Sequence, residues 1–198
     1  MSSIAPAAPF SPHDARRDGP WSGMVRLIAT TFILVIAMNI IHEAGHALAA
    51  KLLGYDALAS INHVKLVPSV ARSAADRLAI DLAGPAVTLG IAIMAWFAVR
   101  RGALTIAPVL LFVALSMRLI AAVASLAAPN DEARASIALG LGKWTLFAIV
   151  IAILLALFVS IYRRAGLGGR WLLGAYVGAS LGFAAVVFGE PFLPTVSL

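Results

Sequence analysis

The stretch LIATTFILVIAMNIIHEAGH, residues 27–46, joins a long apolar run to a metal-binding pattern. Residues 27–41 are almost all apolar, which is typical of a membrane span. His42, Glu43 and His46 then form the pattern H-E-x-x-H. Residues four apart lie on the same face of a helix, so both imidazoles can bind one zinc ion, with Glu43 beside them to take a proton from a zinc-activated water. Ionisable side chains are costly inside a membrane, so we expect these three to be functional.

The composition indicates an integral membrane protein. Of 198 residues, 62% are hydrophobic, and the mean hydropathy is +0.97, whereas soluble domains are about half apolar. We therefore expect a multi-pass protein, in a bacterial cell membrane. The chain has no cysteine, which excludes disulfides and thiolate ligands, so any zinc must use His, Asp or Glu. The net charge of +6 comes mostly from basic residues between apolar segments, which suits lipid headgroups, and we expect no nucleic-acid partner.

Hydropathy predicts an all-α membrane protein, a polytopic bundle of about five transmembrane helices. The predicted spans are residues 24–53, 76–99, 104–128, 144–162 and 171–188. Residues 1–22 are polar and rich in Pro, Ser and Ala, so we expect a disordered tail before a transmembrane domain at 23–198. Residues 61–67 alternate in polarity, which indicates a short strand or β-hairpin after the first span, ended by Pro68.

Small residues mark two packing sites within the spans. The second span contains Leu82-Ala83-Gly84-Pro85, in which Gly84 allows close backbone approach and Pro85 is tolerated in a membrane helix. In the last span Gly174, Gly178 and Gly182 recur every four residues, which predicts a close-packing face. Arg118 lies inside the third span, where it could pair with Asp81 or Glu190, or reach a helix end.

A catalytic zinc needs a third protein ligand and one open position. The available side chains are His13, Asp56, His63, Asp76, Asp81, Asp131, Glu132 and Glu190. Asp131 is the best candidate because it follows an apolar span and stands beside Asn130, which could hydrogen-bond the activated water, a ligand or the backbone. The same run is also a helix-start signal, and Glu132 is the main local rival.

These motifs together resemble the site-2 protease family of intramembrane zinc metalloproteases, over roughly residues 30–135. The resemblance rests on His42-Glu43-Ala44-Gly45-His46, Leu82-Ala83-Gly84-Pro85 and Asn130-Asp131. It implies that His42, His46 and Asp131 bind zinc and that Glu43 is the general base for hydrolysis of peptide bonds, with Asn130, Gly84 and Pro85 as supporting residues. The substrates would be membrane-tethered proteins.

A chain of this length has no room for a PDZ or CBS recognition domain, so we expect a small member of the family that depends on a partner protein to present the substrate. Two other functions stay open at the level of sequence. One is a non-catalytic membrane scaffold of the same fold. The other is an ion or proton transporter that uses the His, Glu and Asp side chains within the membrane.

Overall fold

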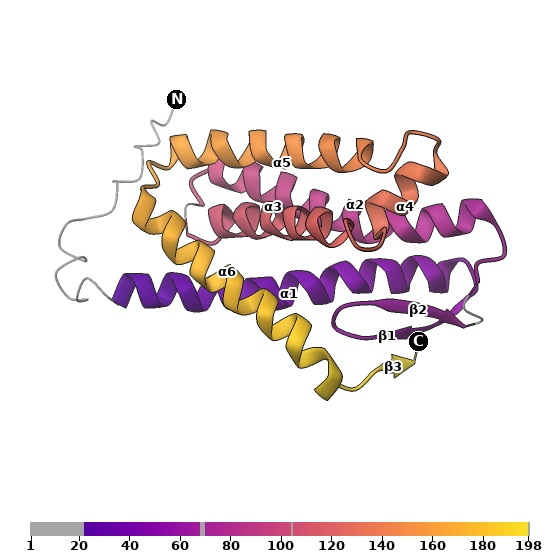
Figure 1. Cartoon of the computed structure of the whole chain (residues 1–198). Helices are drawn as coiled ribbons and strands as arrows, with labels where there is room; N and C mark the ends of the chain where they lie inside the picture. The colour runs from indigo at the N-terminus through magenta and orange to yellow at the C-terminus, as the bar shows by residue number, and fades with distance from the viewer. Residues whose placement is uncertain (1–21, 68–69, 104, 198) are drawn as a thin grey trace, which may run out of the picture.

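A computed structural model describes residues 22–67, 70–103 and 105–197 of the chain, and within them the protein is a helical bundle (Figure 1). Its helices are α1 (Ser22–Leu52), α2 (Ala74–Arg100), α3 (Ala107–Ala124), α4 (Asp131–Ala138), α5 (Thr145–Arg164) and α6 (Gly169–Gly189), the last followed by the 3₁₀ turn η2 (Glu190–Phe192). All of these helices except the short α4 are long and apolar enough to cross a membrane. The predicted bundle of about five membrane helices is therefore confirmed, and the protein is a multi-pass membrane protein. Residues 1–21 of the predicted polar tail lie outside the described residues.

The bundle is held together by apolar side chains from five helices. α1 packs against both α2 and α6, and α3 packs against α5 (Figure 1). The side chains of Val35, Leu111 and Leu154 are completely buried between these helices. Apolar side chains on the opposite faces, such as Ile33 and Met94, are more than half exposed. Apolar residues on both the inner and the outer faces are what a helix needs when lipid replaces water around it.

The close contact of α1 with α6 depends on the predicted glycine face. A Cβ atom on Gly178 would lie 2.5 Å from the carbonyl oxygen of Ile28 and 2.8 Å from the Cβ of Thr31. Both neighbours belong to α1, so the two backbones meet at a distance that only glycine allows. This packing fixes α6 against the helix that carries the H-E-x-x-H pattern.

Local chemistry explains where the helices begin and end. α1 ends before Gly54, whose φ of +77° is accessible to glycine and lets the chain turn toward the first strand. Ser73 caps the N-terminus of α2, because its hydroxyl accepts a hydrogen bond from the backbone N–H of Asp76. α3 ends at Ala124, four residues earlier than the sequence predicted. The reason is that the Asn130 side chain folds back and donates to the carbonyl of Ala121.

A small sheet lies beside the end of α1. Strands β1 (Asp56–Ala59) and β2 (Val64–Val67) form the predicted antiparallel hairpin, with Ala57 opposite Leu66. Strand β3 (Val196–Ser197) pairs with the other edge of β1, so the strand order is β2-β1-β3. This third strand was not predicted, because two residues carry no detectable alternation. Pro68, the predicted end of β2, lies outside the described residues.

Candidate metal centre

The structure brings His42, His46 and Asp131 together from two separate helices. The two histidines lie one turn apart on α1, and Asp131 is the first residue of α4. The Nε2 atoms of the histidines are 3.1 Å apart, and Oδ2 of Asp131 lies 3.1 Å from one and 3.3 Å from the other. A tetrahedral metal centre with bonds of about 2.0–2.1 Å separates its ligand atoms by about 3.3–3.4 Å. The three atoms therefore have the spacing of three ligands of a single ion, and the group can hold a metal.

Hydrogen bonds on the far side of each imidazole direct its lone pair toward this centre. Nδ1 of His46 lies 2.6 Å from the carbonyl oxygen of Ile80, which can only accept, so Nδ1 carries the proton. Nδ1 of His42 lies 3.1 Å from the Thr88 hydroxyl, which itself donates to the carbonyl of Gly84 and so must accept from the imidazole. In the neutral form, both Nε2 atoms are then unprotonated and ready to bind a cation.

Asp131 is held by an ion-pair chain that leads back to α2. Arg134 donates through Nη2 to Oδ1 of Asp131 at 2.7 Å and to Oδ1 of Asp81 at 2.7 Å. Arg77 donates to the other oxygen of Asp81 at 3.1 Å. This chain occupies Oδ1 of Asp131 and leaves Oδ2 for the centre, which is the usual arrangement of a metal-binding carboxylate with a supporting partner.

The same contacts set the charges of this chain. Burial raises the pKa of the Asp131 carboxyl, but His42 and His46, when protonated at Nε2, donate hydrogen bonds to it and lower the pKa by more, so it lies below its ordinary value. Burial lowers the pKa of Arg134, and the hydrogen bond to Asp81 together with both nearby carboxylates raises it by more. Asp131 is therefore an anion and Arg134 a cation at neutral pH.

Gly84 supplies the space that the two imidazoles occupy. A Cβ atom at this position would lie 2.6 Å from Cε1 of His42 and 2.7 Å from its Nε2, and closer still to Nε2 of His46. Real Cβ contacts are essentially never this short. Pro85 follows it, buried within α2, where the helix continues through the proline. The predicted supporting role of Gly84 thus has a steric basis.

Glu43 faces a cavity beside the three ligands. The cavity has a volume of about 500 Å³ and is bounded by α1, α2, α3, α4, α6 and β2. Glu43 is 8% exposed and makes no hydrogen bond or ion pair with any residue that the structure describes. Its carboxylate is therefore uncommitted, at the wall of the same cavity as the three candidate ligands.

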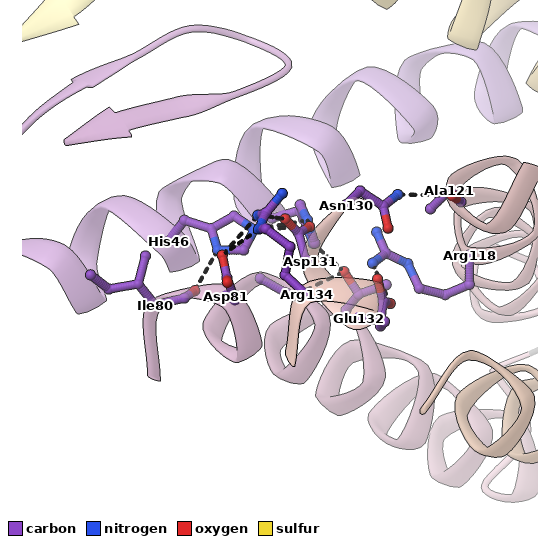
Figure 2. A network of polar contacts seen from close by, with 12 residues as sticks. His46, Ile80, Asp81, Arg118, Ala121, Asn130, Asp131, Glu132 and Arg134 are labelled. Atoms are coloured by element: carbon purple, nitrogen blue, oxygen red, sulfur yellow. Dashed lines mark hydrogen bonds and ion pairs between the residues drawn. The ribbon is translucent and has the colours of Figure 1, made fainter. Parts of the chain in front are cut away.

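The other acidic and histidine candidates are committed elsewhere. Glu132 accepts a hydrogen bond from Arg118 at 2.6 Å, so Arg118 pairs with neither of the two partners that the sequence suggested. The pairing follows from α4, which turns Glu132 away from Asp131 and toward α3 (Figure 2). His63 contacts Glu190 at the end of α6. The remaining candidates are Asp56, paired with Lys51, and Asp76, bonded to Tyr55. His13 lies outside the described residues.

Asn130 serves the backbone rather than the centre. Its Nδ2 donates to the carbonyl of Ala121 at 2.8 Å (Figure 2). Its Oδ1 accepts from the Ser125 hydroxyl at 2.7 Å. Of the three roles open to it from the sequence, the structure selects the backbone contact. By closing the loop between α3 and α4, Asn130 positions the residue that follows it, Asp131.

Sequence reasoning missed Thr88, Arg134 and the carbonyl of Ile80. Thr88 had a usable signal, because it stands one helical turn after Gly84 and therefore on the same face. Arg134 also had a local signal, because it stands three residues after Asp131 on the same helix. The contacts of Arg134 with Asp81 and of His46 with Ile80 depend on how helices pack and leave no local pattern. The chain matches no family model, no curated protein and no solved structure.

Proposed function

We propose that this protein is an intramembrane zinc metalloprotease that hydrolyses peptide bonds of membrane-tethered proteins in a bacterial cell membrane. The observation that carries the proposal is the uncommitted carboxylate of Glu43 beside a His-His-Asp ligand group, at the wall of a cavity. Three nitrogen and oxygen ligands with one open position are characteristic of catalytic zinc sites. The resemblance of the motifs to site-2 proteases supports the same assignment.

The residues divide the chemistry between them. A zinc ion held by His42, His46 and Asp131 would supply a Lewis acid, which acidifies water and polarises a carbonyl group. The Glu43 carboxylate would take a proton from the attacking water as the new C–O bond forms. It would then return that proton to the amide nitrogen as the C–N bond breaks. The hydrolysis consumes one water, and Glu43 ends in its starting form.

The site lies toward one end of α1, which suits a substrate that enters from the membrane surface. Glu43 is six residues beyond the midpoint of the 31-residue helix, or about 9 Å along its axis. Strand β2 lies at one edge of the sheet (Figure 1). Residues 62–66 line the cavity. An extended segment could add to this edge by backbone hydrogen bonds and present its carbonyl groups to the site. A helical segment could not, because its carbonyls are already bonded.

The decisive variant is Glu43→Gln, assayed on zinc-loaded, detergent-purified protein with fluorescein-labelled casein as an unfolded probe. A general base contributes about 10²–10⁴-fold, so we expect cleavage to fall by at least about 100-fold while the zinc content stays unchanged. Asp56→Asn is the matched control, because it also removes one carboxylate but from an exposed ion pair on β1. Full activity in Glu43→Gln would refute the mechanism.

The two alternative functions predict different results. A non-catalytic scaffold would retain zinc and cleave nothing, whether tested on casein or on membrane-tethered substrates with a presenting partner. A transporter would carry ions or protons across liposomes, and Glu43→Gln would affect that flux no more than other charge-removing changes in the site.

A further inference from the structure

A second charged pair, Arg118 on α3 and Glu132 on α4, is buried next to the metal centre. The two residues are 2% and 1% exposed, and Arg118 Nη1 donates to Oε1 of Glu132 at 2.6 Å. Two further polar atoms of the pair, Arg118 Nε and Glu132 Oε2, are buried and have no hydrogen-bond partner among the described residues. Burying an ion pair costs several kcal/mol per ion unless further hydrogen bonds compensate it. Stability alone therefore explains this pair poorly.

The position of Arg118 relates it to the reacting groups. Its side chain lines the same cavity as His42 and Glu43. Figure 2 shows Arg118 reaching from α3 to Glu132, the residue that follows Asp131. The guanidinium is thus a fixed positive charge at the wall of the site.

The other buried or half-buried donors around the cavity are already engaged. Asn39 donates to the carbonyl of Val35, and Asn130 donates to the carbonyl of Ala121. Arg77 and Arg134 both donate to Asp81. Arg118 makes a single hydrogen bond within the described residues, although a guanidinium has five N–H groups. It is therefore the buried donor with capacity left for a ligand.

Lys65 on β2 also lines the cavity, and it is a cation that makes no ion pair with any of the described residues. Its side chain is exposed and belongs to the hairpin rather than to the wall beside Glu43. In water a single ammonium contributes little to stabilising a developing charge, whereas a buried and fixed donor contributes much more. Lys65 therefore serves as a matched control for Arg118.

We propose that Arg118 donates a hydrogen bond to the substrate carbonyl oxygen as that oxygen becomes negative, and so stabilises the tetrahedral intermediate. The inference rests on the proposed function. As the water oxygen bonds to the carbonyl carbon, the π electron pair moves onto the carbonyl oxygen, and Glu43 receives the proton. Arg118 keeps all of its protons throughout. When the C–N bond breaks, the electron pair returns and the hydrogen bond to Arg118 weakens.

The test compares two peptide ligands of the same sequence on the zinc-loaded protein. A peptidyl phosphonamidate carries a tetrahedral, anionic phosphorus that mimics the intermediate, whereas a peptidyl hydroxamate chelates zinc without a tetrahedral centre. The variant is the double change Arg118→Gln with Glu132→Gln, which removes both charges together and leaves no unpaired buried ion. Loss of one such donor costs about 10²–10³-fold in kcat in other hydrolases.

We expect the double variant to bind the phosphonamidate at least about 100-fold more weakly, with less than about a threefold change for the hydroxamate and an unchanged zinc content. In casein cleavage, kcat should fall by about the same factor while KM stays constant. Lys65→Gln should change the affinities for both ligands by the same small factor. Arg118→Lys, which keeps the charge but not the planar fork, should recover part of the phosphonamidate affinity.

An equal loss for both ligands would overturn the inference and leave Arg118 with a purely structural role. An unchanged phosphonamidate affinity of the double variant would also overturn the proposed role of Arg118. In either case the proposed function would still stand if the wild-type protein binds zinc and the hydroxamate. If the double variant does not fold, Arg118→Lys decides in the same way, with an expected loss of about 10-fold for the phosphonamidate alone. A wild-type protein that binds neither zinc nor the hydroxamate would refute the proposed function and this inference together.

Discussion

Replacing Gly84 by alanine tests the geometry of the metal centre with a single methyl group. The added Cβ would lie 2.7 Å from Nε2 of His42, and ordinary contact needs 3.4 Å, so that imidazole must retreat by about 0.7 Å. Ligand distances in metal sites hold within about 0.2 Å, so a movement of this size removes a ligand from the ion. Loss of a supporting contact alone costs about 10–100-fold in metal affinity. We therefore expect Gly84→Ala to weaken zinc binding by at least about 100-fold, or about 2.7 kcal/mol.

The assay is zinc competition with a chromophoric chelator on detergent-purified protein, with helical content and elution volume as checks of the fold. Gly90→Ala is the matched control, because it lies on the same helix and its Cβ would meet no atom within 4 Å. The control should bind zinc as the wild type does. Zinc affinity in Gly84→Ala within about threefold of the wild type would refute the proposed packing of α2 against the histidines.

Two further substitutions probe the support of the site and the packing of the bundle. Thr88→Val removes the acceptor of the His42 Nδ1 proton at nearly constant side-chain volume, so zinc affinity should fall about 10-fold. Thr88→Ser keeps the hydroxyl and should bind zinc as the wild type does. Equal zinc affinities in the wild type and both variants would contradict the tautomer assigned to His42. Gly178→Ala would place a methyl group 2.5 Å from the carbonyl oxygen of Ile28, and such overpacking costs about 1–3 kcal/mol of stability. The midpoint of thermal unfolding of this variant should therefore fall. Gly189→Ala is the control and should unfold at the wild-type temperature, because its Cβ would meet no atom within 4 Å.

The membrane helices were predictable because lipid imposes a simple rule on composition. Each span needs about twenty apolar residues, and the boundaries of the first two spans match the structure within two residues. The end of α3 was predicted too late, since apolar residues continue beyond Ala124, whereas in the structure the helix is capped at Ser125 and the Asn130 side chain donates to the carbonyl of Ala121 in its last turn. The strand β3 escaped prediction because its two residues carry no local signal and pair with β1, which lies far away in the chain.

The residues of the site also differ in whether a local sequence pattern or a tertiary contact determines their position. His42 and His46 are one helical turn apart, so their shared face follows from the sequence alone. The sequence alone does not decide between Asp131 and Glu132 as the third ligand, because adjacent residues on a helix point about 100° apart. The rotation of α4 about its own axis decides which of the two carboxylates meets the histidines. That rotation is fixed by Arg118 and Arg134, whose partners are 14 and 53 residues away in the chain.

The proposed function requires that His42, His46 and Asp131 hold one zinc ion. The most direct measurement is the metal content of detergent-purified wild type, His46→Ala and Asp131→Ala, each checked for its fold. The account predicts close to one zinc per chain in the wild type and almost none in either variant, because each variant removes one of only three protein ligands. A well-folded wild-type protein that binds no zinc even after reconstitution would contradict the account.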